Sequence, residues 1–361
     1  MVNKILIINP FGIGDVLFTT PLIRAIKEFS PETFLGYWCN ERVSPILINN
    51  PFIDRIFPLA RGDLKKIFEN RKFKGIKKAF DLFFTIKKEK FDLAIDFSLD
   101  YRYSLICKLC GIRRRLGFNY KNRNRFLTEK IDIDGYKDKH VVDYYLIILK
   151  FLNFPLPENP RLEIFIPEEE KLWVDEFLKN NNIRENDLLI GIAPAGGASW
   201  GRDAFYLHWP IENFISLCES IIKKNIGRII ILGNFDEKLI CEKIEDKLKG
   251  KILNTAGQLS LNKFLALLSR LNVLVCNDAG PLHMGVGLGI KTVCICGPVD
   301  EKVYGPYPLN QNHRVIKKDF TCRPCYKKFR FSSCQYNLDC LRSIGVEEVF
   351  SAIISLLYKS S

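Results

Sequence analysis

Several features that would indicate particular classes of protein are missing from this chain of 361 residues. No apolar run approaches the length of about eighteen residues that a membrane-spanning helix requires. The best candidate, YYLIILKFLNFPL, is short and has a lysine in its middle. The opening residues, MVNKILIINPFGIGD, contain no apolar run as long as the core of a secretion signal. We therefore expect a globular protein that works in the cytoplasm.

The dinucleotide-binding fingerprint is also incomplete. The turn NPFGIGD supplies Gly12 and Gly14, but Leu17 occupies the place of the third glycine. The second predicted strand is not followed by an acidic residue placed to bind a ribose. These absences exclude a dinucleotide-dependent oxidoreductase.

What the chain has in excess is positive charge, with a formal net charge of +13. The excess is concentrated in residues 61–90, with eleven Lys and Arg against four acids, and 102–130, with nine against one. This balance indicates an anionic partner, which could be nucleic acid, a phosphorylated substrate or an acidic lipid surface. The basic stretches lack the interleaved aromatic residues of a recognised nucleic-acid module, so nucleic acid is not expected.

Twelve cysteines are present, and eight of them are scattered. Several of these eight lie in apolar runs, as buried thiols do in a reducing compartment. The other four are clustered in the spacing Cys322-x2-Cys325-x8-Cys334-x5-Cys340. Four thiolates could hold a structural zinc, although the spacing is not a common finger pattern. Zinc, two disulfides and four free thiols remain open, and no catalytic role is expected for the cluster.

Short apolar runs alternate with longer amphipathic ones, which predicts parallel sheets covered by helices on both faces. Two such series predict two doubly wound α/β domains, over residues 1–165 and 166–361. The second would carry the Cys-rich segment 322–340 and a C-terminal helix. The predicted strands are 4–9, 34–39, 93–97, 115–118, 188–193, 228–233, 273–277 and 292–296.

Ligands bind beyond the carboxyl ends of such strands, so the residues that follow them are the candidates for a site. Asp15 follows the first strand and could either cap a helix or take a proton from an attacking hydroxyl. Glu237 follows another strand and could cap a helix or hold a ribose diol. The loop PAGGASWGRD is either a plain surface loop or an oxyanion site. Its candidate residues are Gly196, Gly197, Ser199 and the nearest cation, Arg202.

The turn NDAGPLHMG follows the predicted strand 273–277. Gly280 and Pro281 precede a small-residue helix, whose N-terminus would offer free N–H groups and a positive dipole end to a phosphate. Asp278 would repel a phosphate, and we expect it to orient the turn by accepting backbone N–H bonds. His283 could be a core histidine or a phosphate ligand.

These motifs together resemble one known family. KILIINPFGIGDVLFTTPLIRAIKE, the Trp209-Pro210 helix start and NDAGPLHMGVGLGIKTVCICGPVD are similar to glycosyltransferase family 9, the lipopolysaccharide heptosyltransferases. The late CRPC…C…C…GVEEVF segment resembles that family too. The resemblance covers nearly the whole chain in the same order.

The resemblance implies a GT-B fold, in which two Rossmann-like domains face an interdomain cleft. It implies an inverting, metal-independent transferase that binds a nucleotide sugar, usually ADP-heptose, on the C-terminal domain. Asp15 then corresponds to the general base and Glu237 to the ribose ligand. The residues Asp278, Ala279 and Gly280 correspond to the donor-diphosphate turn. Leu207 departs from the family, which typically has a lysine there, and Arg202 could substitute for it.

The acceptor would be an anionic glycolipid, bound on the N-terminal domain during peripheral contact with the cytoplasmic face of the inner membrane. Its charged groups suit arginine. The candidate acceptor residues are Gly12, Gly14, Arg61, Arg113, Arg123 and Arg125. The alternatives are a family member with another nucleotide sugar or a non-lipid acceptor and, from a different class, a basic zinc-containing nucleic-acid-binding protein.

Overall fold

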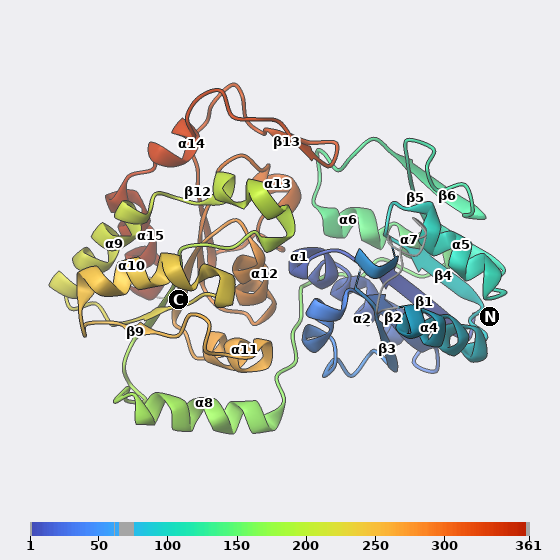
Figure 1. Cartoon of the computed structure of the whole chain (residues 1–361), viewed down its shortest axis with the longest axis horizontal. Helices are drawn as coiled ribbons and strands as arrows, with labels where there is room; N and C mark the ends of the chain where they lie inside the picture. The colour runs from blue at the N-terminus through green and yellow to red at the C-terminus, as the bar shows by residue number, and fades with distance from the viewer. Residues whose placement is uncertain (1, 61, 65–75, 359–361) are drawn as a thin grey trace. The chain divides into compact units, whose positions relative to one another are not determined.

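The computed structural model describes residues 2–60, 62–64 and 76–358. The chain divides into two compact units, Met1–Arg161 and Leu162–Ser361. The predicted boundary after residue 165 lies close to this division. In each unit helices surround a parallel six-stranded sheet (Figure 1). Arg61, one of the predicted acceptor residues, lies outside the described residues.

The sheet of the first unit has the strand order β3-β2-β1-β4-β5-β6. The chain runs outward from β1 in one direction and then starts again with β4 on the other side. The carboxyl ends of β1 and β4 therefore form the switch point of this sheet, where doubly wound folds bind ligands. The elements are β1 (Lys4–Asn9), α1 (Ile13–Leu17), α2 (Thr20–Phe29), β2 (Phe34–Cys39), η1 (Glu41–Ile46), β3 (Arg55–Pro58), α4 (Ile76–Glu89), β4 (Leu93–Asp96), α5 (Tyr101–Leu109), β5 (Arg114–Tyr120), β6 (Glu129–Ile133), α6 (Val141–Leu146) and α7 (Ile148–Phe151).

The sheet of the second unit has the order β12-β11-β10-β7-β8-β9, and its switch point lies between β7 and β10. A short two-stranded hairpin, β13–β14, forms a sheet of its own. The elements are α8 (Glu168–Asn180), β7 (Leu189–Ala193), η2 (Ala198–Leu207), α9 (Ile211–Lys223), β8 (Arg228–Ile231), η3 (Phe235–Glu237), α10 (Lys238–Leu248), β9 (Leu253–Asn254), α11 (Leu261–Ser269), β10 (Val273–Asn277), α12 (Gly280–Gly287), β11 (Thr292–Ile295), α13 (Glu301–Tyr304), β12 (His313–Ile316), β13 (Tyr326–Lys327), β14 (Arg330–Phe331), α14 (Asp339–Arg342) and α15 (Val346–Tyr358).

Each unit has a hydrophobic core of its own. In the first, Trp38, Phe57 and Phe91 are buried together with Leu6 and Ile8 of the central strand. In the second, Trp209 and Phe214 pack among the strands and α15. Burial of one such large side chain stabilises a fold by about 1.5–3 kcal/mol. The predicted class, α/β with two doubly wound Rossmann-like domains of the GT-B type, is confirmed. None of the helices described is both long and apolar enough to cross a membrane.

Candidate functional site

Asp15 lies at the carboxyl edge of the first sheet because only three residues separate the end of β1 from the start of α1. The Asp15 carboxylate accepts a hydrogen bond from the Gly12 N–H at 3.2 Å, which holds the first turn of α1. The side chain of Asn9, the last residue of β1, donates to the Asp15 carbonyl at 2.9 Å. The capping role is therefore present, and the carboxylate is half-buried.

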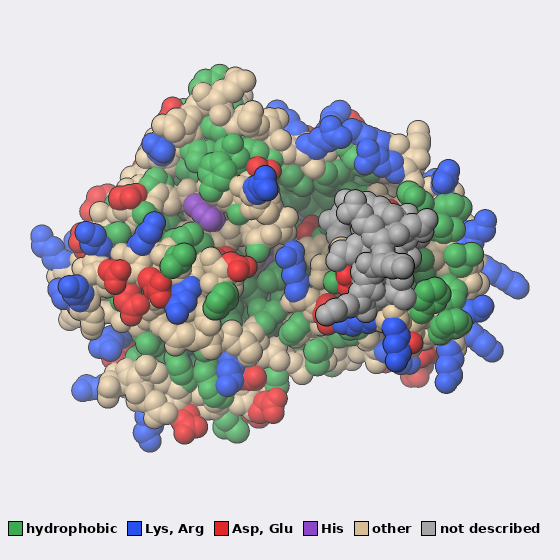
Figure 2. Space-filling model, viewed as in Figure 1, with side chains coloured by type: hydrophobic (Ala, Val, Ile, Leu, Met, Phe, Trp, Pro, Cys, Tyr) green, Lys and Arg blue, Asp and Glu red, His purple; other side chains and the backbone are tan. Residues whose placement is uncertain are grey.

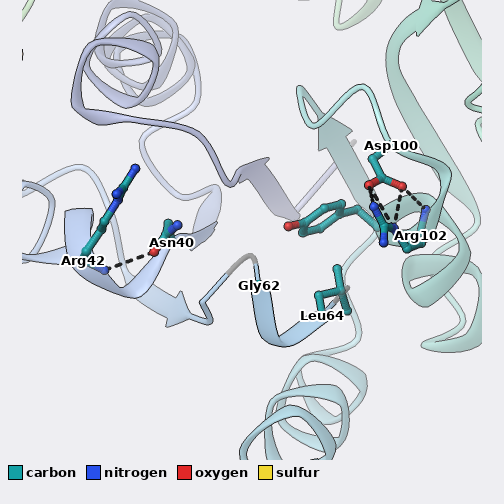
Figure 3. A pocket seen from close by; sticks show the side chains of 7 residues that line it. Asn40, Arg42, Gly62, Leu64, Asp100 and Arg102 are labelled. Carbon is teal, nitrogen blue, oxygen red and sulfur yellow. Dashed lines mark hydrogen bonds and ion pairs between the residues drawn. The ribbon is translucent and has the colours of Figure 1, made fainter. Parts of the chain in front are cut away.

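A cavity of about 510 Å³ opens at the same edge of the first unit (Figure 3). Its walls come from the loops that follow β2, β3 and β4. Since β1 lies between β2 and β4 in the sheet, the strand that leads to the Asp15 helix runs between two of these walls. The lining residues are Asn40, Arg42, Gly62, Leu64, Asp100, Arg102 and Tyr103.

The two arginines that line this cavity differ in their ion pairing. The Arg102 guanidinium donates to the Asp100 carboxylate from Nε at 2.9 Å, and this hydrogen bond raises the pKa of Arg102 (Figure 3). Arg42 is exposed and forms an ion pair with no described residue. Among the described lining residues, Arg42 is therefore the one cation without an ion-pair partner, and the sequence analysis had not singled out either arginine.

Arg123 and Arg125 flank a fully buried residue, Asn124. The Asn124 amide donates to the Asp96 carboxylate at 3.4 Å and accepts a bond from the Ser104 hydroxyl. Burial raises the pKa of Asp96 to about 6. This anchored loop places Arg125 over the ring of Tyr101, with 5.4 Å between the guanidinium carbon and the ring centroid. Arg123 and Arg125 are thus brought together beyond the carboxyl end of β5.

Arg113 lies elsewhere, because it precedes β5 and so belongs to the opposite edge of the sheet. Its neighbours in the sequence serve the fold. Arg114 pairs with Glu129 at 2.8 Å, and Arg115 donates to the Phe126 carbonyl at 2.7 Å. The structure therefore does not bring Arg113 to the other acceptor candidates.

In the second unit, Asn277 ties together the loops at the switch point. Its buried side chain donates to the carbonyls of Pro194 and Ala195, at 2.8 and 3.2 Å. It also accepts from the Trp209 N–H at 2.9 Å. The sequence analysis missed this residue, although a polar side chain at the end of the apolar strand VLVCN was a signal for it.

The two glycines after β7 are required by geometry. Gly196 and Gly197 have φ values of +114° and +82°, which side chains rarely tolerate. A Cβ on Gly196 would lie 2.7 Å from the Cβ of Ala279, so the β7 loop and the turn after β10 are in close contact. The structure thus brings Gly196, Gly197, Ala279 and Gly280 to one place, at the N-terminus of α12.

The other residues of the β7 loop are arranged differently. Ser199 and Arg202 lie in η2 and are exposed. Leu207, which stands where the family typically has a lysine, is buried in the second unit. The Leu207 Cδ1 lies 2.9 Å from the position of a Cβ on Gly197, so its side chain is directed at the glycine loop.

Asp278 is buried, and burial raises its pKa to about 7. The positive charge of Arg323 lowers this pKa and the negative charge of Glu301 raises it. Its carboxylate accepts a hydrogen bond from the Cys296 thiol, at 3.9 Å. No backbone N–H group of the described residues donates to this carboxylate, contrary to the expectation.

The structure is compatible with both predicted roles of Glu237, helix cap or ribose ligand, and with both predicted roles of His283, core residue or phosphate ligand. The Glu237 carboxylate accepts from the Asn234 N–H at 2.9 Å and so caps η3. Its side chain is only half-buried, which leaves it within reach of a ligand. His283 is buried in the first turns of α12.

The Cys-rich segment packs on the loops of the switch point. Tyr326 of β13 lies 4.8 Å from Trp200 in η2, between ring centroids, and Phe331 of β14 lies 4.4 Å from Tyr206. Arg323, with 7% of its side chain exposed, pairs with Glu301 at 3.4 Å and donates to the Val299 carbonyl at 3.1 Å. Residues far apart in the sequence therefore support the same site.

The four clustered cysteines are free thiols, with Cys340 buried and the other three half-buried. Throughout the described ranges, no group of three or more His, Cys, Asp or Glu side chains is arranged to hold a metal ion. A structural zinc at these four thiols, which lie close enough to influence one another's pKa, stays a prediction.

Two doubly wound units, with a carboxylate at the switch point of one and a small-residue turn at that of the other, are typical of GT-B glycosyltransferases. The family model of glycosyltransferase family 9 (heptosyltransferase) matches residues 79–334. Because this match covers more than half of the chain, the protein belongs to glycosyltransferase family 9, as its resemblance had indicated.

Individual relatives agree with this assignment. The chain is 26% identical over 360 residues to a lipooligosaccharide heptosyltransferase 2 of Campylobacter jejuni, covering 98% of this chain and 99% of that protein. A glycosyl transferase of family 9 from Veillonella parvula has a similar fold, with a TM-score of 0.83, 22% identity and coverage of 99% of this chain and 98% of the other. The E. coli ADP-heptose lipopolysaccharide heptosyltransferase II has a TM-score of 0.74 at 19% identity and 98% coverage of both chains.

Proposed function

We propose that this protein transfers heptose from ADP-heptose to a lipopolysaccharide core or related glycolipid, with inversion and without a metal ion. The observation that carries the proposal is the anion turn of the second unit. There Gly196 and Ala279 are in close contact and Gly280 opens α12, so backbone N–H groups and the positive end of the helix converge. The name of the E. coli relative supports ADP-heptose as the donor.

In the proposed reaction, the turn at Ala279 and Gly280 holds the donor diphosphate and Glu237 holds the ribose. The diphosphate carries the negative charge that develops as it leaves the sugar, and the helix end stabilises that charge without a metal. Arg202 is exposed in η2 and would replace the lysine that is absent at Leu207.

The acceptor would bind to the first unit, where Asp15 takes the proton. The acceptor hydroxyl attacks the anomeric carbon, the bond from that carbon to the diphosphate oxygen breaks, and the hydroxyl proton passes to the Asp15 carboxylate. A single displacement of this kind inverts the anomeric centre. Arg42, Arg123 and Arg125 would face the anionic groups of the acceptor. The reaction would take place at the cytoplasmic face of the inner membrane.

Calorimetric titration of ADP-heptose, with UDP-sugars as comparison, tests the donor assignment. We expect ADP-heptose to bind and Gly280→Val to abolish that binding, because a β-branched side chain would crowd the phosphate site. Asp278→Ala should weaken donor binding with less damage to the fold. Full-affinity binding by folded Gly280→Val would refute the anion site. A UDP-sugar that binds more tightly would favour a family member with another donor.

A further inference from the structure

The solvent face of α4 carries phenylalanines where polar residues are expected. Phe80 is 56% exposed and Phe84 is 61% exposed, and the two are four residues apart, so they are neighbours on the helix surface. The opposite face holds Ala79 and Ile86, which are buried in the core of the first unit. The exposed phenylalanines are therefore not part of the packing that holds α4 in place.

Lysines surround these two rings on the same face. At 3.6 residues per turn, Lys77, Lys87 and Lys88 fall within about 100° of arc with Phe80 and Phe84. All three lysines are exposed, and none forms an ion pair with a described residue. The face therefore combines exposed aromatic rings with uncompensated positive charge.

Acidic groups do not neutralise this face. Glu89 of α4 is engaged by Lys4, at 3.2 Å, and by Arg55. Lys78 pairs with Glu41 at 2.6 Å, to one side of the exposed face. Asp81, four residues after Lys77, is the single exposed acid among the described residues of α4, and it borders a face that carries three lysines.

The apolar surface continues beyond α4. Leu109, at the end of α5, is 59% exposed and is followed by Cys110, whose thiol lies 3.7 Å from the Phe83 carbonyl oxygen. Figure 2 shows hydrophobic side chains bordered by Lys and Arg at the end of the first unit where Figure 1 places α4 and α5.

Helix α8 of the second unit provides a contrast within the same chain. It also exposes a large apolar residue, Leu172, at 67%. Its exposed neighbours are mainly acidic, with Glu168, Glu169 and Glu170 in its first turn. The acidic residues around Leu172 would be repelled by an anionic surface, whereas the lysines around Phe80 and Phe84 would be attracted to one.

We propose that the face of α4 formed by Lys77, Phe80, Phe84, Lys87 and Lys88 docks on an anionic lipid bilayer. This inference rests on the proposed function, because it assumes a lipid-anchored acceptor. The phenylalanine rings enter the headgroup boundary while the lysines lie at the level of the lipid phosphates, as in interfacial amphipathic helices. The complementary charge selects a lipid surface over a second copy of this chain, whose matching face would be equally basic.

Sedimentation with vesicles tests the proposal on the full chain without donor or catalysis. The protein is mixed with vesicles of phosphatidylglycerol and phosphatidylcholine, and separately with phosphatidylcholine alone. We expect binding to the anionic vesicles that weakens as salt is added. The double variant Phe80→Ser/Phe84→Ser should bind at least about tenfold more weakly. Lys87→Gln/Lys88→Gln should lose about tenfold or more on anionic vesicles only.

Leu172→Ser is the matched control, since it removes an equally exposed apolar side chain from the acidic helix α8, and it should bind vesicles as the unmodified chain does. All variants should keep their melting temperature and their affinity for ADP. Absence of binding to anionic vesicles, or full binding by the double phenylalanine variant, would refute the proposal. So would a dimer in solution that only the phenylalanine changes dissociate. Failure of ADP to bind would instead refute the transferase proposal and leave the vesicle result standing.

Discussion

Asp15 holds the first turn of α1 and also offers a carboxylate at the carboxyl edge of the first sheet. Asn in its place can still accept the Gly12 N–H bond but has no basicity. We expect Asp15→Asn to fold normally and to bind ADP normally, while turnover falls by about a hundred- to ten-thousand-fold. A transfer assay with saturating donor measures this loss. Near-normal turnover would remove Asp15 from the mechanism.

Gly196 offers a test of the close contact between the two loops of the second unit. Gly196→Ala places a methyl group 2.7 Å from the Cβ of Ala279, at a positive φ. Gly289 also has a positive φ, of +73°, but a Cβ there would meet nothing within 4 Å. Both alanine variants should lose stability by about 1–2 kcal/mol from backbone strain. We expect only Gly196→Ala to weaken ADP binding as well, and equal affinities in calorimetry would contradict the contact.

The raised pKa of Asp278 predicts a pH dependence of stability. The folded protein binds this proton up to about pH 7, whereas the unfolded chain releases it near pH 4. The free energy of unfolding therefore falls as the pH rises through this window. Asp278→Asn cannot titrate, so between pH 5 and pH 8 its stability should rise relative to the unmodified chain, by at most about 2.7 kcal/mol. Denaturant unfolding at both pH values measures the change, and a constant difference would argue against it.

Single residues of the site were predictable where the chemistry is local. Glycines that follow an apolar strand predict a tight turn, and Gly196 does lie against Ala279, the residue before Gly280 at the start of α12. Asn277 was not predictable in the same way, because its partner Trp209 is 68 residues away in the sequence. The thiol partner of Asp278 was missed for the same reason, since Cys296, which follows β11, is 18 residues away in the sequence.

Among the elements, strands that are covered on both faces were the most predictable. The predicted strands 4–9, 34–39 and 273–277 agree with the structure at both ends. The outer strands escaped prediction because their sequences are mixed. In β6, EKIDI, exposed residues alternate with partly buried ones, so no continuous apolar run marks the strand. An outer strand has little to bury, and a sequence pattern that reports burial cannot find it.

The Cys-rich segment 322–340 yields a prediction about support of the loops at the switch point of the second unit. Arg323→Met removes a cation that lies between the Glu301 carboxylate and the Val299 carbonyl. Loss of one partner of a buried pair should lower the stability by about 3–5 kcal/mol. The pKa of Asp278 should rise further, because the charge of Arg323 lowers it.

Arg330→Met, also in the Cys-rich segment, is the control, since Arg330 is exposed. Thermal unfolding and ADP titration at several pH values compare the two variants. Equal behaviour of both would mean that the hairpin does not support the donor site.

At the scale of the whole molecule, the two separate cores predict two cooperative units. A ligand that binds one unit stabilises that unit by mass action, by about 2.7 kcal/mol at a hundred times its dissociation constant. We expect ADP to raise the unfolding temperature of the unit Leu162–Ser361 and to leave that of the first unit unchanged. Calorimetry, or hydrogen exchange resolved by peptide, distinguishes the units. A uniform shift would indicate that they unfold as one.

The chain topology was the part of the site that sequence reasoning could not supply. Arginines that are close in the sequence were all predicted to bind the acceptor. Because Arg113 precedes β5 and Arg123 follows it, the two lie at opposite edges of the sheet. Arg42 and Arg102 meet in a cavity because β2 and β4 lie on either side of β1. The strand order determines which charged residues lie close together, and the strand order cannot be derived from the amino-acid composition.

The distribution of thiols makes the protein suited to site-directed labelling without mutation. Nine of the twelve cysteines are buried, and burial raises the pKa of several, such as Cys39 and Cys218, to about 12. A maleimide dye would therefore find its targets on the Cys-rich segment, at Cys322, Cys325 and Cys334. Because β13 and β14 pack against η2, a fluorophore attached there would report optically on the loop that follows β7 as nucleotide is added.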